Sequence, residues 1–175
     1  MSKQQRTIDR SMSLAQHPAI LETRTLTWPD EPACAAFAAR LAAAPALWPS
    51  TFVALDGPLG AGKTTFVRHL LRALGVAGRV KSPTFAVLEP YDVQGHAVSH
   101  FDFYRFGDAR EWDDAGFRDV FAAPGLKLAE WPDKAAPALP VPDLRLSIEP
   151  DPVHDDARRV TLQAMTPHGV ELLAA

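Results

Sequence analysis

The stretch Gly57-Pro58-Leu59-Gly60-Ala61-Gly62-Lys63-Thr64 decides how this chain folds, because it matches the pattern G-x-x-x-x-G-K-[ST] of a phosphate-binding loop. The apolar, β-favouring segment 51–55 precedes it and predicts a buried strand. The segment 65–74 follows it and predicts a helix that ends before Gly75. A strand, a glycine-rich turn and a helix in this order direct backbone N–H groups and the positive end of a helix at a phosphate.

Two side chains of this loop are expected to contact the ligand directly. Lys63 is predicted to reach the β- and γ-phosphates, and the Thr64 hydroxyl is predicted to bind Mg²⁺. The sequence therefore predicts a protein that binds a nucleoside triphosphate. The residues expected to surround the phosphates are Leu59, Gly60, Ala61, Gly62, Lys63, Thr64 and Thr65.

Composition and charge exclude several classes of protein. The chain has 175 residues, of which 47% are hydrophobic, so it can bury a sizeable core. Its net charge of −3 gives no global positive field, and we expect neither DNA binding nor attraction to a membrane. Cys34 is the single cysteine, which excludes an intramolecular disulfide and a multi-cysteine metal site. Without an apolar run of about 18 residues or a secretory signal, the cytoplasm is the expected compartment.

Hydrophobic patterning predicts one α/β domain over residues 21–175, preceded by a polar leader at residues 1–20 that we expect to be disordered. Asp30 follows a proline break and is a good N-cap for a helix with Phe37 and Leu41 on its apolar face. Two segments near the end alternate apolar and polar residues, which predicts an antiparallel pair of strands. Strands are expected at 21–27, 85–91 with a break at Pro90, 97–104, 126–130, 144–149 and 160–164, and short helices at 108–116, capped by Asp108, and at 117–121.

Hydrolysis requires a carboxylate for Mg²⁺, a group that orients water and a sensor of the γ-phosphate, in addition to the loop. Asp102 and Glu130 come at the carboxyl ends of expected strands, where open α/β sheets bind their ligands. By spacing alone, each of them is equally well a solvated or paired carboxylate. Thr84 lies in a proline-containing loop where GTPases place a threonine that senses the γ-phosphate, and a plain turn hydroxyl is the alternative.

Two histidines, His96 and His100, have the spacing H-x-x-x-H, but the residues between them are strand-like. At about 3.3 Å per residue the two rings stand roughly 13 Å apart, too far to share one metal ion. We therefore expect no zinc site, and we expect His100 to be a packed or hydrogen-bonded strand residue.

A group of basic residues lies on and after the helix that follows the loop. Solvated surface is the first interpretation of such a group, and docking against an acidic partner or an RNA phosphate is the alternative. The group consists of Arg68, Arg72, Arg79 and Lys81.

Four motifs follow one another along the chain: Gly57 to Thr65, Ser82-Pro83-Thr84-Phe85, His100-Phe101-Asp102-Phe103-Tyr104-Arg105 and Glu130-Trp131-Pro132. In this order and at about this spacing they resemble the TsaE family, the bacterial ATPases of tRNA threonylcarbamoyladenosine biosynthesis. The similarity covers roughly residues 21–165. The chain departs visibly from the family's pattern at the leader and at the loop 151–156, and neither segment contains a motif. The resemblance implies an α/β fold of the P-loop NTPase type, with a mainly parallel central sheet, antiparallel flanking strands and helices on both faces.

The resemblance also assigns site residues. It implies that Thr64, Glu130 and Asp102 bind Mg²⁺, with Asp102 similar to a Walker-B carboxylate, and that Thr84 is a switch residue. Trp131 would pack near the nucleotide or the partner surface. By rough alignment, Asp30 and Arg158 contact the nucleotide. The residues with an implied catalytic role are Lys63, Thr84, Asp102 and Glu130.

The function implied by the resemblance is hydrolysis of ATP with Mg²⁺ in support of the partner proteins TsaB and TsaD, which modify tRNA at the adenosine next to the anticodon. Contact with tRNA would be indirect, through the complex. No arginine is plainly placed as an arginine finger, so we expect slow hydrolysis without partners.

Two other classes of enzyme share the phosphate-binding loop. A small-molecule or nucleotide kinase stays open, although the acidic and aromatic stretch 108–124 does not suggest the arginine-rich lid that many kinases use. A GTPase is excluded as a class, because the chain contains no asparagine and so has no N-K-x-D guanine-reading motif.

Overall fold

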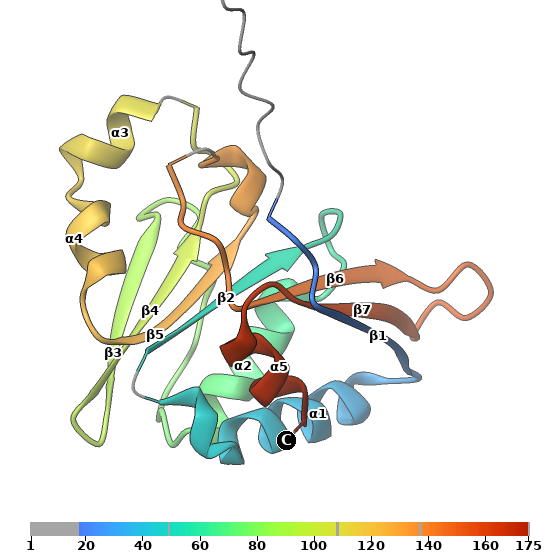
Figure 1. Ribbon diagram of the computed structural model, residues 1–175. Helices are drawn as coiled ribbons and strands as arrows, with labels where there is room; N and C mark the ends of the chain where they lie inside the picture. Colours follow the sequence, from blue (N-terminus) through green and yellow to red (C-terminus); the bar gives the residue numbers. More distant parts are fainter. Residues whose placement is uncertain (1–17, 49, 108, 137, 175) are drawn as a thin grey trace, which may run out of the picture.

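A computed structural model describes residues 18–48, 50–107, 109–136 and 138–174. Within this part, seven strands form one sheet in the order β1-β7-β6-β2-β5-β4-β3 (Figure 1). The strands are β1 Glu22–Trp28, β2 Ser50–Asp56, β3 Leu88–Val93, β4 His96–Asp102, β5 Gly125–Glu130, β6 Leu144–Pro150 and β7 Arg158–Ala164. The helices are α1 Glu31–Ala43, α2 Lys63–Ala73, α3 Ala109–Asp114, α4 Phe117–Ala122 and α5 Pro167–Ala174, and two 3₁₀ turns are η1 Pro45–Leu47 and η2 Pro132–Lys134.

The centre of the sheet is parallel and its flanks are antiparallel. Strand β2 runs parallel to both β5 and β6, and β4 runs parallel to β5. Strands β3, β7 and β1 are added in antiparallel fashion at the two sides. The expected fold class is confirmed. Because the carboxyl ends of β2, β4 and β5 meet at one edge, the residues that follow these strands gather there.

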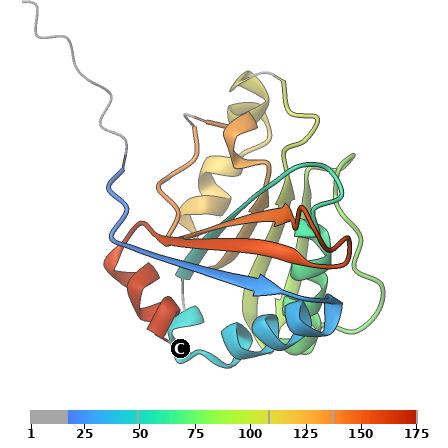
Figure 2. The ribbon, with the colours of Figure 1, turned by 90° about the vertical axis from the view of Figure 1, so that its right-hand side faces the viewer.

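Helices cover both faces of the sheet, and two hydrophobic cores result (Figures 1 and 2). Alternate residues of β2 supply the two cores, since successive side chains of a strand point to opposite faces. Val53 and Leu55 pack with residues of α1, α2 and α5, whereas Phe52 and Ala54 pack with aromatic residues of α3 and α4. The central strand is thus buried from both sides and holds the loop that follows it in place.

Some expected boundaries need correction. Strand β3 continues through Pro90, where we had expected a break. It is an edge strand with a single neighbour, so a residue without a backbone N–H is tolerated there. Helix α2 begins at Lys63, two residues before the predicted start, and β4 ends at Asp102, two residues before the predicted end.

Helix α5 was not predicted at all. Its start has a recognisable signal, because Thr166 stands before Pro167 and its hydroxyl accepts a hydrogen bond of 3.1 Å from the backbone N–H of Gly169. Gly169 makes this start signal hard to recognise in the sequence, because glycine is unfavourable inside a helix. The packing explains the glycine: a Cβ at this position would collide with the carbonyl oxygen of Asp143.

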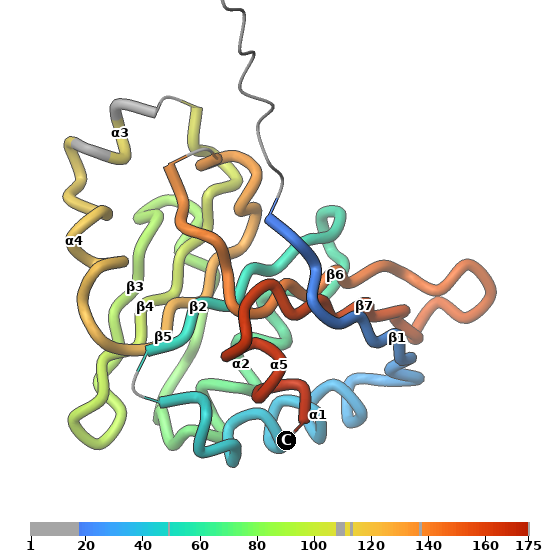
Figure 3. The backbone as a smooth tube through the Cα atoms, in the orientation of Figure 1, coloured from blue at the N-terminus to red at the C-terminus, as the bar shows by residue number. Residues whose placement is uncertain are grey.

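Two expectations concern residues outside the described part. Asp108, the predicted helix cap, lies outside the described residues, and so do residues 1–17 of the leader that we expect to be disordered. Within the described ranges, no helix has the length and apolar character needed to cross a membrane. The tube in Figure 3 shows the hairpin of β6 and β7 extending from the body of the sheet, with the turn 151–157 at its tip.

Candidate nucleotide-binding site

The glycine-rich loop connects β2 to α2, and its glycines are needed for its shape. Gly57 has a positive φ of 132°, and a Cβ there would collide with the carbonyl oxygen of Ile148. Gly62 is the N-cap of α2 with a left-handed φ of 111°. The first N–H groups of a helix have no partner inside the helix, so the loop and the start of α2 form a site for an anion.

A cleft of about 300 Å³ lies at this loop. It brings together all the residues predicted to bind nucleotide or metal, except Asp30 and Arg158. Its lining also includes Ser82 and Tyr104, to which we had assigned no role. The cleft is lined by Leu59, Gly60, Ala61, Gly62, Lys63, Thr64, Thr65, Ser82, Thr84, Asp102, Tyr104, Glu130 and Trp131.

Asp30 and Arg158 line a second, smaller cleft of about 130 Å³, which shares loop residues with the first. The Asp30 carboxylate accepts a hydrogen bond of 2.9 Å from the backbone N–H of Ala33, so its predicted role as the N-cap of α1 is confirmed. Arg158 Nε donates a hydrogen bond of 2.9 Å to the carbonyl oxygen of Ala61. Arg158 therefore connects the start of β7 directly to the phosphate-binding loop.

Glu130 is held between the loop helix and a neighbouring strand. The Thr64 hydroxyl lies 2.9 Å from each of the two Glu130 carboxylate oxygens, which share its single donated proton. Nε2 of His100 lies 2.9 Å from Oε1 of the same carboxylate. Glu130 and His100 are only 2% and 0% exposed. The prediction that His100 is hydrogen bonded in a strand is confirmed, and its partner is the carboxylate at the end of β5.

Asp102 organises the loop that contains Thr84. Its Oδ2 accepts hydrogen bonds from the hydroxyls of Thr84, at 2.8 Å, and of Ser82. Its Oδ1 accepts a hydrogen bond of 2.9 Å from the backbone N–H of Tyr104. In the pairing of β4 with β5, Asp102 stands directly opposite Glu130, so the two carboxylates occupy the same level of the sheet.

Lys63 lies in the wall of the cleft, 4% exposed. Its ammonium group donates hydrogen bonds to the carbonyl oxygens of Gly57, at 2.6 Å, and of Pro58, at 2.9 Å. It also lies 3.8 Å from the centre of the Trp131 ring, within the range of a cation–π interaction. Burial lowers the pKa of Lys63, and the negative charges of Glu130, Asp102 and Asp56 oppose that shift.

The oxygen ligands of the cleft suit Mg²⁺ better than zinc. Within the described ranges, no three His, Cys, Asp or Glu residues gather into a set that could hold a metal ion by itself. Mg²⁺ prefers oxygen ligands, keeps several waters and is bound through one or two carboxylates plus substrate phosphates. The Thr64 hydroxyl with the carboxylates of Glu130 and Asp102 fits that description.

Comparisons with known proteins identify the family. A family model described as threonylcarbamoyl adenosine biosynthesis protein TsaE matches residues 28–160. A TsaE protein of Haemophilus influenzae is 41% identical over 123 residues, which cover 70% of this chain and 76% of the relative. A TsaE protein of Bacillus subtilis is 35% identical over 117 residues, or 67% of this chain and 72% of the relative.

A solved structure agrees with this assignment. The crystal structure of YdiB from Bacillus subtilis superposes with a TM-score of 0.69 at 26% identity, covering 87% of this chain and 93% of that one. The family model spans the loop, Asp102 and Glu130 alike. On these matches the chain belongs to the TsaE family.

Proposed function

We propose that this protein binds and hydrolyses ATP with Mg²⁺, and that hydrolysis supports a TsaB–TsaD complex in threonylcarbamoyladenosine modification of tRNA. One observation carries the enzymatic part: a threonine hydroxyl in the first turn of the loop helix is bonded to both oxygens of a buried strand-end glutamate. The pathway rests on the family, whose relatives are named for this biosynthesis. With this role, the proposed compartment is the cytoplasm.

The chain's own groups divide the work of holding the nucleotide. The loop N–H groups and Lys63 bind the phosphates, and the start of α2 adds its partial positive charge. Of the three groups Thr64, Glu130 and Asp102, the first two would hold Mg²⁺, which when bound would neutralise charge on the β- and γ-phosphates. Glu130 is the better candidate for direct contact, because it touches Thr64. Asp102 is already bonded by Thr84 and Ser82, so we assign it to setting the position of Thr84.

The nucleoside part of ATP is proposed to reach the second cleft, on the other side of the loop. Asp30 and Arg158 line that cleft, together with Trp28. The indole Nε1–H of Trp28 is buried and has no hydrogen-bond partner in the described part of the protein. Such a donor is costly to bury without a partner, and a polar atom of the nucleoside would satisfy it.

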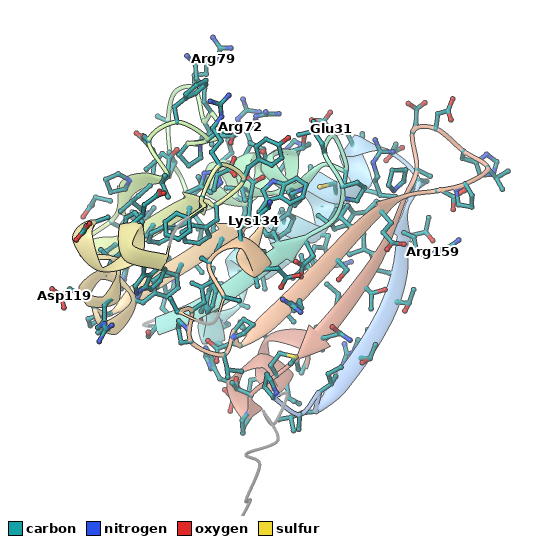
Figure 4. All side chains as sticks on the ribbon, turned by 90° about the horizontal axis from the view of Figure 1, so that it is seen from above. Glu31, Arg72, Arg79, Asp119, Lys134 and Arg159 are labelled. Carbon is teal, nitrogen blue, oxygen red and sulfur yellow. The ribbon has the colours of Figure 1, made fainter. Side chains whose placement is uncertain are left out.

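Partner proteins are proposed to dock at the mouth of the first cleft. Three large apolar side chains are exposed there or beside it: Leu59 by 75%, Phe85 by 84% and Tyr104 by 41%. The Arg105 guanidinium stacks 4.2 Å from the centre of the Phe85 ring. Aromatic residues and arginine are the types enriched at protein interfaces. In Figure 4, Arg72 and Arg79 project at one end of the molecule, away from Asp119.

The test is phosphate release from ATP by this protein alone and with TsaB and TsaD. We expect slow release alone and a clear stimulation by the partners, because no arginine lines the first cleft within the described part to act as a finger. A small-molecule or nucleotide kinase is the alternative. Transfer of the γ-phosphate to a small acceptor, with no phosphate release under either condition, would establish the kinase instead.

A further inference from the structure

We infer that His100 is a positioning residue for Glu130, which holds the carboxylate in the orientation that faces Thr64; this inference rests on the proposed function. The two residues come from adjacent parallel strands, β4 and β5. His100 lies two residues before Asp102 on β4, which places its ring next to the carboxylate on the neighbouring strand. The contact is His100 Nε2 to Glu130 Oε1, 2.9 Å.

The hydrogen-bond chemistry defines what His100 does. An ionised carboxylate only accepts hydrogen bonds, so Nε2 carries the proton and donates it to Glu130. The other ring nitrogen, Nδ1, is buried and has no partner among the described residues. The ring is therefore a single-point donor with no second contact through which to relay a proton.

Glu130 has few other hydrogen bonds to fix the orientation of its carboxylate. It is the last residue of β5, and the following residue, Trp131, turns away with a left-handed φ of 57°. Its side chain has three torsions. Apart from His100, its hydrogen-bond partner among the described residues is the Thr64 hydroxyl, the group with which it is proposed to hold Mg²⁺. His100, by contrast, lies within β4, between paired residues of β3 and β5. His100, held in its strand, thus fixes the orientation of the Glu130 carboxylate.

The experiment compares His100→Leu, which removes the donor, with His100→Gln, whose amide N–H can occupy the place of Nε2. His96→Gln, at an exposed position of the same strand, is the matched control. Two experiments are made: steady-state kinetics give kcat and KM for ATP with TsaB and TsaD, and calorimetry gives the affinity for ADP with and without Mg²⁺. Removing the partner of a metal-binding side chain costs about 10- to 100-fold. For His100→Leu we therefore expect kcat to fall by about 10- to 100-fold, with KM nearly unchanged. We expect a decrease of the same size in the factor by which Mg²⁺ raises the affinity for ADP. His100→Gln should recover most of both.

The double variant His100→Leu with Glu130→Gln distinguishes a positioning role of His100 from a general effect on folding. If His100 acts through Glu130, then His100→Leu should have no further effect on Mg²⁺-dependent ADP binding once Glu130→Gln is present. Equal losses in both backgrounds, or no recovery in His100→Gln, would overturn the inference. Should His100→Leu not fold, His100→Asn replaces it, because its shorter amide does not reach Glu130. The ADP measurement needs no turnover, so it decides about His100 even if the protein proves not to hydrolyse ATP.

Discussion

Lys63 combines three contacts at one ammonium group: two loop carbonyls and the face of Trp131. A hydrogen bond from a charged group contributes about 1.5–3 kcal/mol, which corresponds to roughly 10- to 150-fold in affinity. We predict that Lys63→Ala weakens ATP binding by about 100-fold or more in calorimetry. Lys134→Ala, at an exposed lysine that Figure 4 labels, is the control and should bind normally. A normal ATP affinity of Lys63→Ala would show that Lys63 does not bind the phosphates.

Cys34 predicts how stability depends on alkaline pH. Burial, together with the negative charge of Glu31, raises the pKa of the Cys34 thiol from 9.0 to about 12. Between these values the unfolded chain releases a proton that the folded protein keeps, so stability falls as pH rises above 9. The slope from one such group is up to about 1.4 kcal/mol per pH unit.

The variant Cys34→Ala lacks this group and should lose less stability between pH 8 and pH 10. Urea unfolding at the two values measures the difference. Other groups that titrate in this range, such as Tyr91, are common to both proteins and cancel. Identical changes in the two proteins would show that the thiol titrates normally in the fold.

The hairpin of β6 and β7 is the element that connects the far side of the sheet to the phosphate-binding loop. Arg158, at the start of β7, donates to the Ala61 carbonyl and, through Nη1, to the carbonyls of Asp155 and Ala157, both at 2.7 Å. We predict that Arg158→Met weakens ATP binding by about 10-fold, since a charged donor to the loop is lost. Its neighbour Arg159 is exposed and labelled in Figure 4, and Arg159→Met should bind as the wild type does. Equal ATP affinities in the two variants would show that Arg158 does not contribute to ATP binding.

Helix α5 packs too closely for a larger residue at Gly169. Overpacking a close contact costs typically 1–3 kcal/mol, because backbone has to move. We predict that Gly169→Ala lowers the free energy of unfolding by about that amount in urea denaturation, while ATP affinity stays unchanged. Gly107→Ala is the control, because a Cβ there meets nothing within 4 Å. A stability equal to that of the control would mean that α5 is free to shift.

The sequence predicted elements well where a local signal exists. The octet from Gly57 to Thr64 requires a strand before it and a helix after it, and both are present. The contact between His100 and Glu130 had no such signal, because it depends on which strands are neighbours in the sheet. That order follows from long-range packing, which periodicity along the chain does not record. Pro90 was misjudged for the same reason, since its effect depends on β3 being an edge strand.

At the scale of the molecule, we propose that residues 21–175 fold as one unit. Strand β1, near the start, pairs along its whole length with β7, near the end, and α5 packs in the same core as α1 and α2. Separate folding of the two halves would leave β1 without its partner. The same arrangement places the proposed docking surface around the mouth of the nucleotide cleft, so a bound partner would sense which nucleotide is present.

We propose that Glu130, at the end of β5, makes this protein a partner-dependent ATPase. The most direct measurement is phosphate release in the presence of TsaB and TsaD, comparing wild type with Glu130→Gln at ATP concentrations that saturate both. Glu149→Gln, at an exposed glutamate near the end of β6, is the matched control. We predict that Glu130→Gln binds ATP but releases phosphate at least about 100-fold more slowly than the wild type, while the control variant releases it at the wild-type rate. Wild-type turnover by Glu130→Gln would contradict it.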